Sequence, residues 1–197
     1  MAVISILLSS RVYAFYTVQD TGHLIKPNQL AFGTSLQWIT HGPTRGVNLL
    51  GHLDVGFNDS SNFRIEAGGG TTDAVLGAYY KWVPFPDFGQ QPAVGFTFGA
   101  QYSHYLGASE VAARFIPLAS KRFAIKTDSA SGAVTPYVAL PLALATYNNT
   151  TEVPVQIALG AKYHDDRFKT CDFLAELDFD VNQAPNSIVF GAQFPAF

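Results

Sequence analysis

The stretch from Val47 to Phe57 alternates between two kinds of residue. One set of alternate positions is entirely apolar or glycine, and the intervening set contains Asn48, His52 and Asp54. A period of two is typical of a β-strand with two different faces. After a turn at residues 58–62 the same pattern resumes. Together the two stretches predict a β-hairpin.

The same alternation recurs from Asn28 to the last residue, in about ten runs separated by turns rich in Gly, Pro, Asn and Asp. One run changes phase near Pro117, which predicts a bulge because proline cannot donate to a ladder. Residues 134–147 are apolar on both faces, and their prolines favour a single strand over a helix. The sequence therefore predicts an all-β domain over residues 28–197: a single up-and-down antiparallel barrel of about ten strands with short turns on both sides.

The segment before the barrel divides into two parts. Residues 1–14, MAVISILLSSRVYA, have a short apolar core followed by small residues at Val12 and Ala14, which predicts the remnant of a secretory signal peptide. An additional strand is the alternative. Residues 15–27 lack alternation and are predicted to be an N-terminal lead-in.

Composition excludes several classes of protein. Only 14% of residues are charged, against roughly 25% in ordinary soluble domains. The net charge of −3 and the absence of a basic run argue against a nucleic-acid partner. A single Cys excludes an internal disulfide, and no Cys/His spacing predicts a metal site. We expect no cofactor.

The residues on the polar face indicate which face lies inside. A surface facing water is usually rich in charge, whereas this face is mostly Gly, Ala, Ser, Thr, Gln and Asn. Small polar residues fit a confined lumen, with the apolar face against lipid. This favours a transmembrane barrel over a soluble, lipocalin-like one. The predicted lumen-lining residues are Asp54, Arg64, Glu66, Lys81, Gln101, Arg122, Lys162, Asp172, Glu176, Asp178 and Asp180.

Aromatic residues gather near the predicted strand ends. If residues 28–40 run outward from the periplasm, an outer belt contains Trp38, Tyr102 and Tyr147. The corresponding inner belt contains Phe57, Trp82, Tyr163, Phe194 and Phe197. Two belts are typical of rings at the two membrane interfaces.

The last predicted strand resembles the C-terminal strand of bacterial outer-membrane β-barrel proteins, through Phe190, Phe194 and terminal Phe197. Pro195 departs from their strict alternation. The wider pattern over residues 28–197 resembles small porin-like barrels of this class. The resemblance implies location in the bacterial outer membrane, contact with the lipid bilayer, and insertion by the barrel-assembly machinery.

These observations predict a narrow pore for small solutes. The alternatives are a closed barrel with a structural or envelope-interaction role and, less favoured, a soluble ligand-binding barrel. The inward charges predict either a salt-bridge network or a weakly selective pore lining. We expect no enzyme, because Ser103 and His104 are adjacent on a strand and point to opposite faces. His52 beside Asp54 lacks an evident nucleophile.

Overall fold

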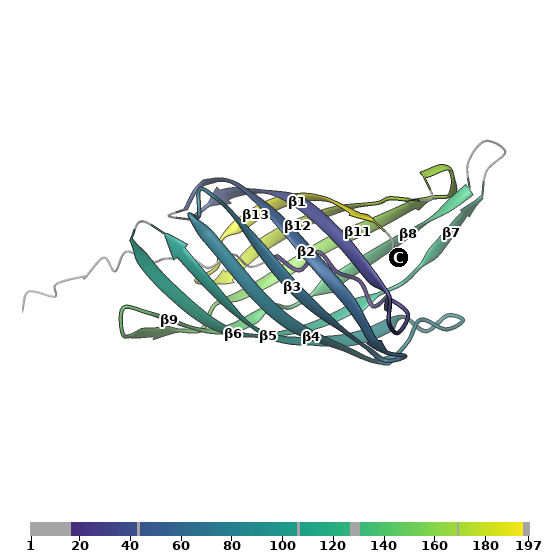
Figure 1. Cartoon of the computed structure of the whole chain (residues 1–197), viewed down its shortest axis with the longest axis horizontal. Coiled ribbons are helices and arrows are strands. Elements are labelled where there is room, and N and C mark those ends of the chain that lie inside the picture. The colour runs from purple at the N-terminus through teal and green to yellow at the C-terminus, as the bar shows by residue number, and fades with distance from the viewer. Residues whose placement is uncertain (1–16, 43, 106, 127–130, 169, 195–197) are drawn as a thin grey trace, which may run out of the picture.

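A computed structural model describes residues 17–42, 44–105, 107–126, 131–168 and 170–194 (Figure 1). Strands dominate the described chain, and its one helical element is a single 3-10 turn. The elements in chain order are β1 (Leu30–His41), β2 (Gly46–Asn58), β3 (Ser61–Gly70), β4 (Ala74–Phe85), β5 (Ala93–Tyr105), β6 (Ala108–Ser120), β7 (Phe123–Lys126), β8 (Ser131–Ala139), β9 (Leu142–Tyr147), β10 (Thr150–Glu152), β11 (Val155–Asp165), η1 (Asp166–Phe168), β12 (Asp172–Asn182) and β13 (Asn186–Phe194).

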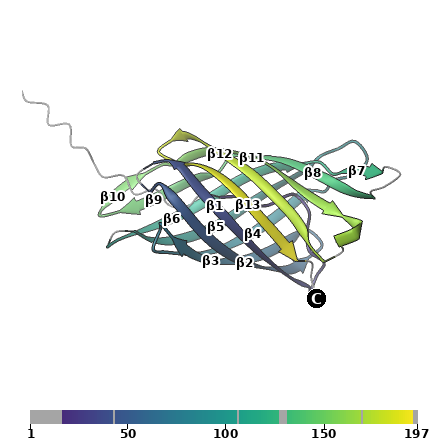
Figure 2. The same ribbon diagram turned by 90° about the horizontal axis from the view of Figure 1, so that it is seen from above.

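The strands form a closed, ten-stranded, antiparallel up-and-down barrel. Three of the barrel strands each consist of two consecutive segments: β6 with β7, β8 with β9, and β10 with β11. Closure comes from β1, which pairs with β2 along one edge and with β13 along the other. The strands are steeply tilted around the long axis in both ribbon views (Figures 1 and 2). The predicted all-β barrel of about ten strands is confirmed.

The two ends of the barrel differ. We call the end at which β1 begins and β13 ends the inner rim, and the opposite end the outer rim. The hairpin of β7 and β8 projects from the inner rim, and that of β9 and β10 from the outer rim (Figure 1). Between β9 and β10, Asn148 and Asn149 have φ values of 44° and 63°. Positive φ at both positions is what a two-residue hairpin turn requires, and Asn tolerates it better than most residues.

The bulge expected at Pro117 is wrong. β6 runs through Pro117, which pairs with Phe96 without a change of register. The Pro117 carbonyl accepts a hydrogen bond from Leu140, and the nitrogen of a strand residue points toward the same neighbour as its carbonyl. The hydrogen-bond donor that Pro117 lacks would therefore point at the neighbouring strand where that strand is interrupted, between β8 and β9. The single strand expected over residues 134–147 is accordingly divided in two, and β6 is separated from β7 by Lys121 and Arg122.

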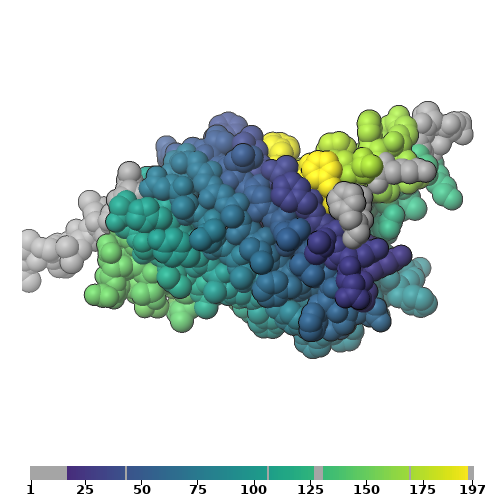
Figure 3. All heavy atoms as spheres, viewed as in Figure 1, coloured from purple at the N-terminus to yellow at the C-terminus, as the bar shows by residue number. Residues whose placement is uncertain are grey.

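The alternation in the sequence corresponds to two faces of the barrel wall. Leu49 is 61% exposed on the outside, whereas Gln101 and Glu176, which point inward, are 2% and 1% exposed. Large apolar side chains are exposed on most of the barrel strands, and the fully buried side chains include Gln37, Asn48 and Gln156 among others. The space-filling view shows one side of this outer surface, over β1 to β6 (Figure 3). The large exposed apolar groups thus lie on the outside, and the interior combines polar and charged groups with smaller apolar clusters, such as the one around Ile116 and Leu118.

Candidate functional site

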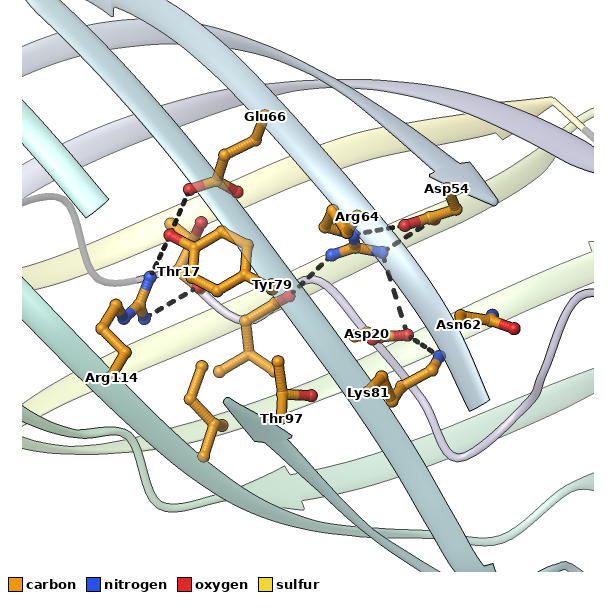
Figure 4. A pocket seen from close by; sticks show the side chains of 12 residues that line it. Thr17, Asp20, Asp54, Asn62, Arg64, Glu66, Tyr79, Lys81, Thr97 and Arg114 are labelled. Carbon is orange, nitrogen blue, oxygen red and sulfur yellow. Dashed lines mark hydrogen bonds and ion pairs between the residues drawn. The ribbon is translucent and has the colours of Figure 1, made fainter. Parts of the chain in front are cut away.

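The residues that precede β1 run inside the barrel. We call residues 17–24 the lumenal segment; Thr17, Val18, Gln19 and Thr21 are all buried there. Figure 4 shows Thr17 and Asp20 lying among side chains of the wall. The segment lies in the part of the chain that the sequence predicts as a lead-in. Alternation carries no information about a segment that is not a strand, so its place in the lumen is a finding of the structure.

Cationic side chains from β3, β4 and β6 face the carbonyls of the lumenal segment (Figure 4). Because this segment pairs with no strand, its backbone groups need other partners inside the barrel. The contacts are Arg114 Nη2 to the Thr17 carbonyl (3.2 Å), Arg64 Nη1 to the Val18 carbonyl (3.2 Å), and Lys81 Nζ to the carbonyls of Thr21 (3.2 Å) and His23 (2.8 Å) and to Asp20 Oδ1 (2.8 Å).

The amides of the same segment face a carboxyl group. Glu176 on β12 accepts from the amide of Val18 at 2.9 Å and from that of Gln19 at 2.7 Å. The Tyr137 hydroxyl donates to Glu176 at 2.5 Å. Farther along, the Gly22 amide donates to Ser120 Oγ at 2.8 Å. Carbonyls therefore meet cations and amides meet acceptors, so the wall is complementary to the backbone of the segment.

Arg64 and Asp54 form a short ion pair inside the lumen. Arg64 Nε donates to Asp54 Oδ1 at 2.6 Å, and Arg64 Nη2 donates to Asp54 Oδ2 at 3.0 Å. Gln193 Nε2 donates to the same Oδ2 at 2.8 Å. Two parallel bonds between a guanidinium and a carboxylate fix orientation as well as charge. This pair holds Arg64 in position to reach the Val18 carbonyl.

Tyr79 connects a second part of the network. Its hydroxyl lies 2.7 Å from Glu66 Oε1 and 2.9 Å from Gln101 Oε1. Arg114 Nη1 donates to the Tyr79 hydroxyl at 3.1 Å and to Gln101 Oε1 at 2.9 Å. The Arg114 guanidinium also lies 5.5 Å from the centre of the Tyr79 ring. Paired and hydrogen-bonded in this way, the charges avoid much of the cost of burial.

Glycines on the inner face make room for the large lumenal rings. A Cβ atom built on each of three such glycines would come within 2.2 Å of a ring on a neighbouring strand. The three glycine–ring pairs are Gly33 with His52, Gly99 with Tyr79, and Gly160 with Tyr137. Glycine on this face therefore allows a wide side chain to lie across the lumen.

Each rim has its own polar cluster. At the inner rim Lys162 Nζ lies 2.9 Å from Asp172 Oδ2 and 2.6 Å from Gln193 Oε1, and His164 Nδ1 lies 2.6 Å from Asp172 Oδ1. Toward the outer rim a chain of hydrogen bonds crosses several strands. Its links are Ser187 Oγ to Asp178 Oδ2 (2.6 Å), Gln37 Nε2 to Ser187 Oγ (3.1 Å), Asn48 Nδ2 to Gln37 Oε1 (3.2 Å), and the Thr72 amide to Asn48 Oδ1 (2.8 Å).

Little free volume remains beside the lumenal segment. The cavity among Arg64, Tyr79, Lys81 and Arg114 measures about 20 Å³, which is close to the space that one water molecule needs. A larger cavity of about 750 Å³ lies at the inner rim, with Thr21, Gly22, His23 and Leu24 on one side. We call this inner-rim cavity the vestibule.

The predicted lumen-lining residues fall into three groups. Buried inside are Asp54, Glu66, Lys81, Gln101, Glu176 and Asp178. Half-buried are Arg64, Lys162 and Asp172. The exposed ones are Arg122, which lines the vestibule, and Asp180, which accepts from the Ala184 amide at 3.0 Å in the turn between β12 and β13. Asp180 thus differs from the expectation of a lumenal position, because β12 has already reached the outer rim there.

The aromatic residues lie near the two rims. Trp38 and Tyr102 are exposed toward the outer rim, as are Phe57, Trp82 and Phe194 toward the inner rim. Tyr147 and Tyr163 are half-buried near the ends of β9 and β11. Phe197 and the predicted signal-peptide remnant at residues 1–14 lie outside the described residues.

Sequence reasoning missed Asp20, Tyr137 and Gln193 as members of the network. Tyr137 lies in a stretch that is apolar on both faces, so alternation did not single it out. For Asp20 the sequence offered one indication: it is the single Asp, Glu, Lys or Arg in residues 15–25 of the lead-in. The partners of all three are distant in the sequence, and only the closed barrel brings them together.

The structure also places the residues considered for chemistry. Ser103 is buried on the inner face, while His104 points outward, where its Nδ1 lies 3.1 Å from Ser109 Oγ. His52 Nε2 lies 3.7 Å from Asp54 Oδ2. Among the residues that the structure describes, no group of three or more His, Cys, Asp or Glu side chains is arranged to hold a metal ion.

Comparison of the sequence with protein-family models and with curated proteins finds no match. Over the described ranges, no helix is long and apolar enough to cross a membrane.

Proposed function

We propose that this protein is an integral membrane β-barrel whose lumen is kept closed by its own lumenal segment. The observation that carries the proposal is the inverted burial of the wall. Gln37, Asn48 and Glu176 are almost fully buried, whereas Leu49, Trp38 and Phe57 are 61%, 56% and 69% exposed. In soluble proteins large apolar patches of this kind are rare, and in transmembrane barrels they face lipid.

The soluble ligand-binding alternative requires an apolar interior. A lipocalin-like barrel holds its ligand against inward apolar side chains. Here the interior contains ion pairs such as Arg64 with Asp54 and carboxyl groups such as Glu176. An interior of this kind favours the membrane barrel, for which we propose the bacterial outer membrane as location and the barrel-assembly machinery as the partner in insertion. The proposal assigns no catalytic role.

The filled lumen favours the closed barrel over the narrow pore. The lumenal segment occupies the interior, and the cavity beside it measures only about 20 Å³. A solute path along the axis requires that segment to leave. The side chains that bind it, including Arg64, Lys81 and Glu176, then form the polar lining of a channel. In the conformation described, a structural or envelope-interaction role is the better supported.

Two measurements test the proposal. The first is the behaviour of the purified chain: we expect it to require detergent for solubility and to migrate differently on gels before and after heating. A monomer that stays soluble without detergent contradicts the membrane assignment. The second is conductance in planar bilayers, where we expect no steady current from the full chain and a current after deletion of residues 17–24. Steady current from the full chain contradicts the closed lumen.

A further inference from the structure

The vestibule combines apolar walls with several charged groups. Its apolar lining includes Leu24, Pro86, Ala93, Ala124 and Ala133. Its charged or titratable lining consists of His23, Asp59, Asp87, Lys121, Arg122, Lys162, His164 and Asp172. The lumenal segment separates it from the interior. A cavity of about 750 Å³ with mixed lining is large enough for a small organic molecule.

Beside the vestibule the inner rim is uneven, because the projecting β7 extends beyond β5 and has no strand next to it on that side; we call this place the gap beside β7. The pairing of β5 with β6 ends at Ala93 and Ser120, and β7 beyond it pairs only with β8. The turn at residues 86–92 contacts the two residues that precede β7, because its Asp87 accepts from Lys121 Nζ and, at 2.8 Å, from the Arg122 amide. Side-chain and turn contacts thus replace a strand ladder at this position.

A groove on the outer face reaches the same place. It measures about 320 Å³ and is lined by Pro92, Ala119, Pro136 and Val138, together with Ser120 and Lys121, which also line the vestibule. Phe88 in the turn at residues 86–92 and Phe123 at the start of β7 are 82% and 54% exposed. The vestibule is therefore bordered by apolar surface on the outside of the barrel as well as by the open inner rim.

The charges of the vestibule leave one strong cation available. Asp172 is already paired with Lys162 and His164, and Asp87 with Lys121. The guanidinium of Arg122 lies close enough to Asp87 for their charges to interact, but it donates no side-chain hydrogen bond within the described parts of the chain. The vestibule's other carboxylate, Asp59, belongs to the exposed turn between β2 and β3. A guanidinium binds a carboxylate or phosphate through parallel hydrogen bonds.

We propose that the vestibule binds an amphiphile that carries one anionic head group. The head group lies against Arg122, and the apolar chain lies along Ala93, Ala124 and the gap beside β7. The inference uses the membrane barrel of the proposed function only for the origin of the ligand, which enters from the lipid side. Binding itself needs only the vestibule.

Photo-crosslinking of the full chain in a non-ionic detergent tests this proposal. The probe is a fatty acid with a diazirine on its chain, and mass spectrometry identifies the labelled residues. We expect saturable labelling within residues 86–92 and 123–126. Arg122→Gln should weaken apparent binding about tenfold, the change expected from one lost charge-assisted hydrogen bond. Arg45→Gln, an exposed arginine at the outer rim, is the matched control and should leave binding unchanged.

The competing outcomes are distinct. Equal labelling by the uncharged alcohol of the same chain length, or an unchanged affinity in Arg122→Gln, overturns the role of the anion. Competition by acetate or inorganic phosphate as strong as that by laurate shows a site for free anions and overturns the amphiphile. Labelling spread evenly over the outer surface overturns the site altogether. Because the test is done in detergent, it can succeed or fail independently of membrane insertion and conductance.

Discussion

The carboxyl group of Glu176 accepts a hydrogen bond from the backbone amide of Val18, 2.9 Å away and 158 positions earlier in the chain. This contact joins β12 to a segment that belongs to no sheet. Arg64 binds the carbonyl of the same Val18 from β3. The lumenal segment is therefore fixed from two sides of the barrel, and its removal is the structural step that separates a closed barrel from an open one.

Glu176→Gln should loosen the lumenal segment. The amide of glutamine retains only one acceptor oxygen, whereas Glu176 accepts from Val18, Gln19 and Tyr137. Loss of hydrogen bonds in this buried site should lower the free energy of unfolding by about 1–3 kcal/mol. Urea unfolding in detergent measures this loss, and hydrogen exchange at Val18 and Gln19 should become faster. The matched control is Glu152→Gln on β10. Unchanged exchange at both amides contradicts the assigned role.

Replacement of Arg64 separates charge from geometry. Arg64→Ala leaves Asp54 buried without its cation and should cost about 3–5 kcal/mol of the free energy of unfolding. Arg64→Lys keeps the charge but loses the two parallel hydrogen bonds, so its cost should be clearly smaller yet measurable. Thermal and urea unfolding of the two variants provide the comparison. Equal stability of Arg64→Ala and the unmodified chain refutes this account of the ion pair.

His23 should make the barrel less stable in mild acid. Burial of the imidazole against the barrel wall lowers its pKa from 6.5 to about 4. The positive charges of Lys162, Lys81 and Arg122 lower the pKa further, and the negative charge of Asp172 opposes them. The unfolded chain therefore binds the proton at a higher pH than the folded chain does. The contribution is fully present above pH 6.5 and is lost as the pH falls toward about 4.

Unfolding midpoints measured between about pH 7 and pH 4 test this dependence. His23→Gln cannot take up the proton, so its midpoint should fall less over this interval than that of the unmodified chain. The carboxyl groups titrate in both proteins, and the difference between the two curves isolates His23. If the unfolding midpoints of the two proteins fall by the same amount between about pH 7 and pH 4, this explanation is wrong.

The barrel strand formed by β8 and β9 should be the most easily opened part of the wall. Four prolines lie in this strand or in the strands on either side of it. The carbonyl of each proline accepts a hydrogen bond from the neighbouring strand, but the proline nitrogen cannot donate one in return. The pairs are Pro117 with Leu140, Pro136 with Lys121, Pro141 with Gln156 and Pro154 with Ala143. Hydrogen exchange should therefore be faster over residues 137–145 than over residues 47–57 in β2. Equal protection of the two strands excludes this weakness.

Alternation in the sequence predicts much of this fold because most of the strands have one face of large apolar residues and one face of mainly small or polar residues. It placed Leu49 outside and Asp54 inside from their positions alone. The error at Pro117 arose because alternation does not show which neighbour a strand nitrogen faces. That information depends on the register between strands, which only the folded sheet provides.

The position of the lumenal segment inside the barrel could not be predicted from alternation in the sequence, for a related reason. The partners of Val18 lie on β3 and β12, and a lead-in without periodicity gives no indication of which wall it will contact. The glycine beneath Tyr137, Gly160, likewise acquires its purpose only when β8 and β11 are side by side. Sequence pattern thus describes the wall of the barrel, and packing across the lumen determines whether that wall encloses a channel.

The most direct test of the membrane barrel uses its two tryptophans, Trp38 near the outer rim and Trp82 near the inner rim. Both side chains are exposed on the apolar outer surface. The unmodified chain is reconstituted into vesicles whose lipids carry bromine either near the head group or at mid-chain, and tryptophan fluorescence is measured. We expect strong quenching by both lipids, greater for bromine near the head group, as for rings at the two interfaces. Fluorescence that no brominated lipid quenches, while acrylamide in the buffer does, contradicts the account.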